Sequence, residues 1–224
     1  MKIFVVYTSF SHLFQLKYKM SKLEFINSPI RNAKLEKDKL EMICSCFVED
    51  FTASQTAKKI NISRQTINSY YKILRTYLID QQKMLDNIFL STISNKSTLT
   101  IKYFIYNSNV IFYVQDNDNT YFLSNENTNK LDIFINSSLK DSLLKHKRAN
   151  CARVLYNTNT KEYYVSGFLK SSHDVDNFIT NRLKKFRGIN KENYVVHISE
   201  SFIRYNNTNS SLKKQLLDFL NIKY

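Results

Sequence analysis

The chain has 224 residues, 43% of them hydrophobic, which is enough to bury a core in one large domain or two small ones. It carries 33 Lys and Arg against 19 Asp and Glu. This net charge of +14 favours a polyanion such as nucleic acid as the partner, because each neutralised phosphate releases counterions. The alternative is a basic protein that merely stays in solution.

No apolar run reaches the ~18 residues of a membrane-spanning helix, so we expect no membrane partner. The cysteines (Cys44, Cys46 and Cys151) and the scattered histidines form neither a disulfide framework nor a metal cluster. Reduced thiols and a DNA partner predict a cytoplasmic, nucleoid-associated protein.

Residues 1–34 are predicted to be an N-terminal extension. The start of the chain is apolar enough to resemble a signal peptide, but its apolar stretch is short and no small-residue cleavage site follows. We therefore expect residues 1–19, ahead of Met20, to be an upstream extension or an arm.

Residues 35–82 are predicted to form a helix-turn-helix DNA-binding domain. An apolar pattern at helical spacing begins at Leu35 and breaks at residues 50–52, where Thr52 is a good N-cap for the next helix. That short helix is expected to end at Ile60.

A turn and a longer helix follow, with the helix expected over 63–82. Asn61 takes the turn position, where φ is positive and Gly or Asn is favoured. Ser63 is placed to cap the longer helix. Ile67 and Tyr70 fall where that helix must pack on the first one.

The outer face of the longer helix is dense in short hydrogen-bonding side chains. Arg64 suits guanine edges and Gln65 suits adenine edges, while hydroxyl groups suit phosphates or bases. An ordinary helical hairpin is the alternative, but it does not explain this face. The DNA-contacting residues predicted here are Ser63, Arg64, Gln65, Thr66, Asn68 and Ser69.

Residues 83–97 are predicted to be a linker, and residues 98–224 a second domain. Strands are expected over 98–106, 110–115, 120–124, 151–156 and 161–168, and helices over 137–147, 174–187, 191–205 and 210–221. Antiparallel strands followed by α/β alternation are the order expected of an RNase H-like fold. The fold class is therefore α+β: an all-α helix-turn-helix, then an RNase H-like α/β domain with C-terminal helices.

Two parts of the chain resemble one family of bacterial insertion-sequence transposases. Residues 63–71 look like the family's recognition helix, S-R-x-T-x-N-x-Y-Y. Residues 173–189 resemble its last catalytic block, N-G-I-E-x-F-W, and the following K-R-x-L-x-K-F-x-G-I run. Arg204-Tyr205-Asn206 matches the R-[FY]-N that ends the family's next helix. The resemblance covers about residues 35–82 and 173–206.

This resemblance implies a DDE-type domain, in which three acidic or amide side chains hold two Mg²⁺ ions for DNA strand cleavage and joining. It places Asp176 at the late-helix acid and residues 156–159, Tyr-Asn-Thr-Asn, where the family has Tyr-Thr-Asp, so that Asn157 is at most a weak ligand. The first predicted strand has no carboxylate, and Asp116 and Asp118 fall in a hairpin turn. Asp176 is thus the only surviving catalytic and metal-ligating candidate, and a degenerate member is expected. An acid that merely serves the helix dipole is the alternative for Asp176.

The C-terminal half supplies a second basic surface. Residues 140–190 carry 11 Lys and Arg against 4 Asp and Glu. We predict phosphate contacts from Lys184, Lys185, Arg187 and Arg204, with a solvated basic face as the alternative.

Three functions remain open at this point. The first is a transposase-family protein that binds double-stranded DNA, with strand transfer lost. The second is an active transposase that uses two Mg²⁺ ions in DNA recombination, and the third is a DNA-binding transcriptional regulator. A homodimer is compatible with all three.

Overall fold

The computed structural model describes residues 35–93, 98–107, 109–116, 119–124, 153–157, 160, 162–166, 174–186, 189 and 191–220. Its helices are α2 (Lys37–Val48), α3 (Ala53–Ile60), α4 (Arg64–Ile93), α7 (Asp174–Lys185), α8 (Lys191–Asn206) and α9 (Asn209–Phe219). Its strands are β1 (Thr98–Tyr106), β2 (Asn109–Asp116), β3 (Asn119–Phe122), β4 (Arg153–Asn157) and β5 (Glu162–Ser166). The described chain is α+β, as predicted. The predictions for residues 1–34 and 137–147 lie outside the described residues.

The local signals of the helix-turn-helix are confirmed. Thr52 caps α3 in a capping box with Gln55, which satisfies otherwise unpaired N–H groups at the helix start. Asn61 adopts the left-handed conformation, with φ 54° and ψ 48°. The Thr66 N–H donates to Ser63 Oγ at 3.1 Å, as expected of a cap on α4.

Helix α4 continues well beyond its predicted end near residue 82. It runs without a break to Ile93, so the predicted linker is helical over residues 83–93. This segment has no Gly or Pro to end the helix, and Phe89 is buried in a stack on Tyr121 with ring centroids 3.6 Å apart. The predicted end of the helix near residue 82 was wrong because a tertiary contact extends the helix.

The strands form one sheet in the order β3-β2-β1-β4-β5, and every neighbouring pair is antiparallel. The α/β alternation expected behind β3 would make β4 parallel to β1. Instead Thr98 pairs with Asn157 and Lys102 with Arg153 in antiparallel register. Strands β4 and β5 also pair in antiparallel register, and the four residues of sequence that separate them are too few for a parallel crossover.

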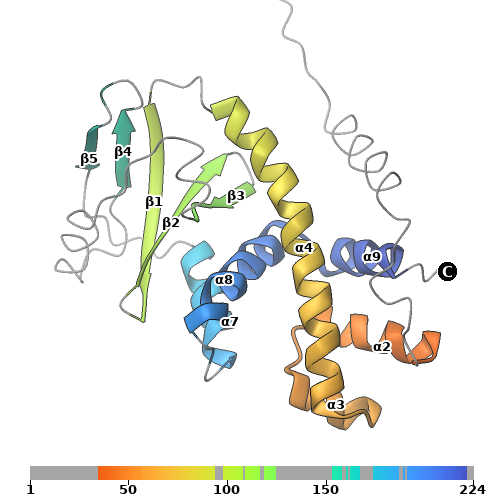
Figure 1. Ribbon diagram of the computed structural model, residues 1–224. Coiled ribbons are helices and arrows are strands. Elements are labelled where there is room, and N and C mark those ends of the chain that lie inside the picture. The colour runs from red at the N-terminus through yellow and green to blue at the C-terminus, as the bar shows by residue number, and fades with distance from the viewer. Residues whose placement is uncertain are drawn as a thin grey trace, which may run out of the picture.

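One face of the sheet packs on α7 and α8, and α8 lies between the sheet and α4 (Figure 1). The buried residues of this core are Phe104, Ile111, Tyr113, Val175, Ile179, Leu183, Ile198 and Phe202. Among the described helices, none is both long and apolar enough to cross a bilayer.

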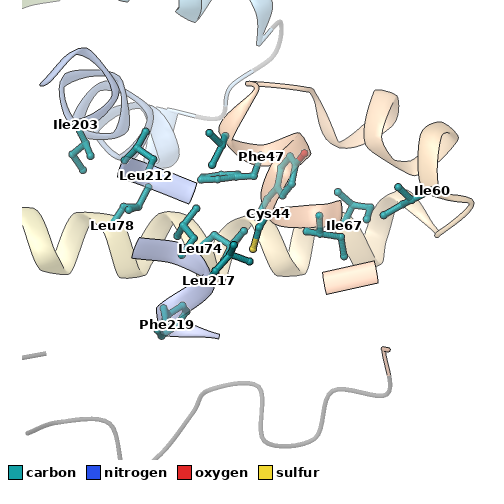
Figure 2. Packing of buried hydrophobic residues seen from close by; sticks show 14 residues of the cluster. Cys44, Phe47, Ile60, Ile67, Leu74, Leu78, Ile203, Leu212, Leu217 and Phe219 are labelled. Atoms are coloured by element: carbon teal, nitrogen blue, oxygen red, sulfur yellow. The ribbon is translucent and has the colours of Figure 1, made fainter. Parts of the chain in front are cut away.

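A second core lies between α2, α3, α4 and the C-terminal helices (Figure 2). Ile67 and Leu74 of α4 belong to the same cluster of buried residues as Leu212 and Leu217 of α9, and the ring of Phe219 stacks on Tyr77. The predicted boundary between domains 35–82 and 98–224 is therefore not a boundary in the packing. The end of the chain completes the core of the helix-turn-helix.

Candidate nucleic-acid interface

The first turns of α4 present one polar face to solvent. The side chains of Arg64, Gln65, Asn68, Ser69 and Lys72 line a single shallow hollow. Four of them belong to the predicted set, and the structure brings these four together. Lys72 was not predicted from the sequence, although it stands four residues after Asn68 and so extends the same helical face.

The opposite face of α4 is held rigidly. Ile67 is fully buried, and the hydroxyl groups of Thr56 and Tyr71 lie 2.6 Å apart in a buried hydrogen bond between α3 and α4. Burial also raises the pKa of the Tyr71 hydroxyl to about 12, so it stays protonated. Because the inner face is fixed, the polar face keeps a defined orientation relative to α3.

The predicted DNA-contacting residues divide into two groups. The hydroxyl of Ser63 lies 2.8 Å from that of Thr66 within the cap, and the Ser69 hydroxyl donates to the Gln65 carbonyl at 3.1 Å. These hydroxyls bond to their own helix. Arg64, Gln65 and Asn68 are exposed side chains with donors and acceptors that reach further.

The electrostatics of this segment favour an anion. Residues 51–79 contain five Lys or Arg and no Asp or Glu. Lys59 pairs with Glu49 at 3.9 Å, and Arg75 pairs with the buried Glu200. In the described part of the chain no ion pair involves Arg64 or Lys72.

Arg204 was predicted to contact DNA, and the structure corrects this prediction. Its side chain is only 5% exposed, and its Nη atoms donate to the Phe47 and Val48 carbonyls at the end of α2. Its Nε donates to Glu200 at 2.9 Å. A buried guanidinium needs such partners. Because these contacts hold the Arg204 guanidinium inside the protein, it is not placed to contact DNA.

The other two residues of the Arg204-Tyr205-Asn206 motif are also structural. The Tyr205 ring packs edge-on against the ring of Phe178 of α7, with the ring centroids 5.5 Å apart. The Asn206 side chain accepts from the Thr120 N–H at 2.9 Å and donates to its carbonyl at 2.7 Å. Each motif residue thus joins α8 to a different element: α2, α7 and β3.

The basic run at the end of α7 lies next to the helix-turn-helix. Lys185 Nζ is 3.3 Å from Asp50 Oδ2, just before α3, and its side chain is 56% exposed. Lys184 is exposed as predicted. Arg187 lies outside the described residues.

Asp176 lies in the first turn of α7 and faces the sheet. The Tyr113 hydroxyl donates to its Oδ1 at 3.1 Å. Burial raises the pKa of Asp176 to about 7, although the Tyr113 hydrogen bond and the charge of Lys102 act in the opposite direction. Its partial burial and its hydrogen bond to Tyr113 distinguish Asp176 from an exposed acid that only serves the helix dipole.

The described residues around Asp176 do not form a two-magnesium site. Among the described residues, no group of three His, Cys, Asp or Glu side chains could hold a metal ion. Lys102 is the β1 residue whose charge acts on Asp176. Asn157 pairs with Thr98, which lies four residues from Lys102 along β1, or about 13 Å at ~3.3 Å per residue. Asn157 Oδ1 also accepts from the Thr160 N–H at 3.2 Å. The catalytic set that the resemblance implies is therefore not assembled by Asp176 and Asn157.

Comparison of the chain with family models, with curated proteins and with solved structures finds no match. The polar face of α4 and the contacts of Asp176 are therefore the observations that bear on function.

Proposed function

We propose that this protein binds double-stranded DNA with sequence specificity, placing the first turns of α4 in the major groove. The observation that carries the proposal is the polar face of Arg64, Gln65, Asn68 and Lys72, which stands opposite the buried Ile67. A helix fixed on one side and rich in exposed donors on the other is suited to reading base edges.

Each side chain of this face has a chemically distinct task. Arg64 can donate two hydrogen bonds to guanine O6 and N7, and Asn68 or Gln65 can make a bidentate pair with adenine, each worth about 1–3 kcal/mol of discrimination. Lys72 and Lys184 carry point charges that suit phosphates, which contribute affinity without sequence information.

We infer descent from insertion-sequence transposases, with DNA strand transfer lost. The motifs at residues 63–71 and 173–189 support this descent. An RNase H-like origin of the second half is supported by a sheet that carries α7 and α8 on one face, whereas the antiparallel β4 departs from it. This departure, and the lack of any group of three possible metal ligands among the described residues, both fit a chain that has retained DNA binding without the chemistry.

The test is selection from a pool of random duplexes with the full chain, at moderate salt. We expect a short enriched consensus containing guanine, and we expect Arg64→Lys, which keeps the charge but loses the planar fork, to lose enrichment at that guanine. Recovery of the starting pool without any enrichment would contradict sequence-specific binding.

An active transposase remains the competing function, and a strand-transfer assay separates the two. We expect no joined product from the selected duplex with Mg²⁺ or Mn²⁺, because side-chain amides bind Mg²⁺ more weakly than carboxylates do. Robust turnover that disappears in Asp176→Ala would overturn the loss of chemistry. A transcriptional regulator would show the same DNA binding with no product.

A further inference from the structure

A buried cluster of charges connects the helix-turn-helix to α7 and α8. Glu200 of α8 is fully buried and accepts hydrogen bonds from Arg75 Nε at 2.6 Å and Arg204 Nε at 2.9 Å. Arg182 Nη2 lies 2.7 Å from the same carboxylate. These guanidiniums hold the pKa of Glu200 well below its usual range despite its burial. The cluster, completed by Asp50, consists of Asp50, Arg75, Arg182, Glu200 and Arg204.

Asp50 is the member of the cluster that lies just before the start of α3. It lies between α2 and α3, two residues before the N-cap Thr52, and its φ of 60° is in the left-handed region. Asp, like Asn and Gly, tolerates that region, so Asp50 can occupy the turn without strain from its side chain. Its Oδ1 accepts from Arg182 Nε at 3.0 Å.

The cluster holds more positive than negative charges, so each carboxylate in it matters. Three guanidiniums, from Arg75, Arg182 and Arg204, face two carboxylates, from Glu200 and Asp50. Arg182 is only 3% exposed, and its other described partners are Glu200, the Ser201 hydroxyl and the His197 carbonyl. An uncompensated buried charge is costly, and the structure therefore strongly favours keeping the α2–α3 junction against α7.

We propose that Asp50 is a positioning residue for DNA recognition. Its pairing with Arg182 fixes α3, and with it the polar face of α4, against α7. Arg64 and Lys184 are then presented to one duplex in a fixed register. This inference rests on the proposed DNA-binding function, but the geometry it asserts can be measured without DNA.

The variant that tests it is Asp50→Asn, compared with Glu49→Gln. Asparagine tolerates the positive φ and keeps an acceptor oxygen, so Asp50→Asn removes mainly the charge. Glu49→Gln removes the same charge one residue earlier, where the side chain is 52% exposed and pairs with Lys59 at 3.9 Å. Both chains carry the same net charge, so a difference between them comes from the buried contact.

The first readout is the distance between two spin labels, one on α3 and one on α7. The exposed Ser54 and Asn181 are suitable sites once Cys151 is replaced by serine, since Cys44 and Cys46 are buried. We expect Asp50→Asn to broaden the distance distribution and Glu49→Gln to leave it unchanged. If Asp50→Asn does not fold, Arg182→Lys, which keeps the charge but not the planar fork, should show the same broadening.

The second readout is affinity for the selected duplex and for a random duplex. We expect Asp50→Asn to bind the selected duplex about tenfold more weakly, a moderate coupling between sites, while its affinity for random DNA follows that of Glu49→Gln. Unchanged label distances, or equal affinities of the two variants for the selected duplex, would overturn the positioning role. A wild-type chain that binds no duplex would refute the proposed function instead, and the label distances would still report on Asp50.

Discussion

The arginines whose side chains the structure describes fall into two groups that the sequence alone does not distinguish. Arg64 stands on an exposed polar face, in a segment without acidic residues. Arg204 and Arg182 are buried and bonded to a carboxylate, a hydroxyl group or backbone carbonyls. A net charge of +14 therefore overstates the basic surface open to a polyanion, because part of that charge stabilises the fold.

The largest effect should come from breaking the buried group. Glu200→Gln leaves the guanidiniums of Arg75, Arg182 and Arg204 without their shared carboxylate, so we expect a loss of about 3–5 kcal/mol in the free energy of unfolding. The measurement is urea denaturation of the full chain at pH 7.

The matched control is Glu41→Gln. Its carboxylate is 34% exposed and pairs with Lys213 at 3.6 Å, so we expect a loss of less than about 1 kcal/mol. Similar small losses in both variants would mean that the buried cluster contributes no more than a surface pair.

The second prediction concerns the sheet face. The folded state raises the pKa of Asp176 from 3.8 to about 7, so the native chain binds the proton more tightly and loses stability as pH rises through that window. Asp176→Asn cannot ionise, and its amide oxygen still accepts from Tyr113. We expect this variant to match the wild type near pH 4 and to exceed it above pH 7 by about 2 kcal/mol, a value reduced for partial solvent access.

Urea midpoints at a series of pH values provide the check, with the exposed Asp174→Asn as control. His197 acts in the opposite direction: burial lowers its pKa to about 4, so its contribution to stability is lost as pH falls from 6.5 towards 4. The difference between Asp176→Asn and wild type isolates the acid from this background. A pH-independent difference would refute the raised pKa.

The smallest effect should distinguish two neighbouring lysines. Lys184→Ala should lower the slope of log affinity against log salt by about one for each phosphate that is no longer neutralised. Lys185→Ala should lower it less, because Lys185 Nζ already lies 3.3 Å from Asp50. Equal slopes for both variants and the wild type would show that the end of α7 is a solvated face.

Local chemistry explains why the helix-turn-helix could be predicted in detail. The capping residue Thr52, the left-handed turn residue Asn61 and the buried Ile67 depend on neighbours a few residues away. The partners of the buried arginines, in contrast, lie far away in the sequence. Arg204 bonds to the Phe47 carbonyl across 157 positions of sequence, and Arg75 to Glu200 across 125. No spacing rule reaches that far, so Arg204 was assigned to DNA.

For the sheet, too, local features could be predicted from the sequence and long-range pairing could not. The strand positions follow from β-branched and aromatic runs, and each lies close to its predicted range. The direction of β4 depends on the pairing of Thr98 with Asn157, which local propensity does not determine. The contact between Tyr113 and Asp176 likewise needs the packing of α7 on β2.

Guanine readout by Arg64 in the major groove can be measured by methylation interference on the selected duplex. Methylation of guanine N7 blocks the atom that an arginine fork contacts. We expect at least one guanine whose methylation weakens wild-type binding. We also expect Arg64→Ala to bind about 1–3 kcal/mol more weakly and to respond no longer to methylation at that guanine. Interference that is absent from the wild type, or that persists in Arg64→Ala, would contradict guanine readout by this side chain.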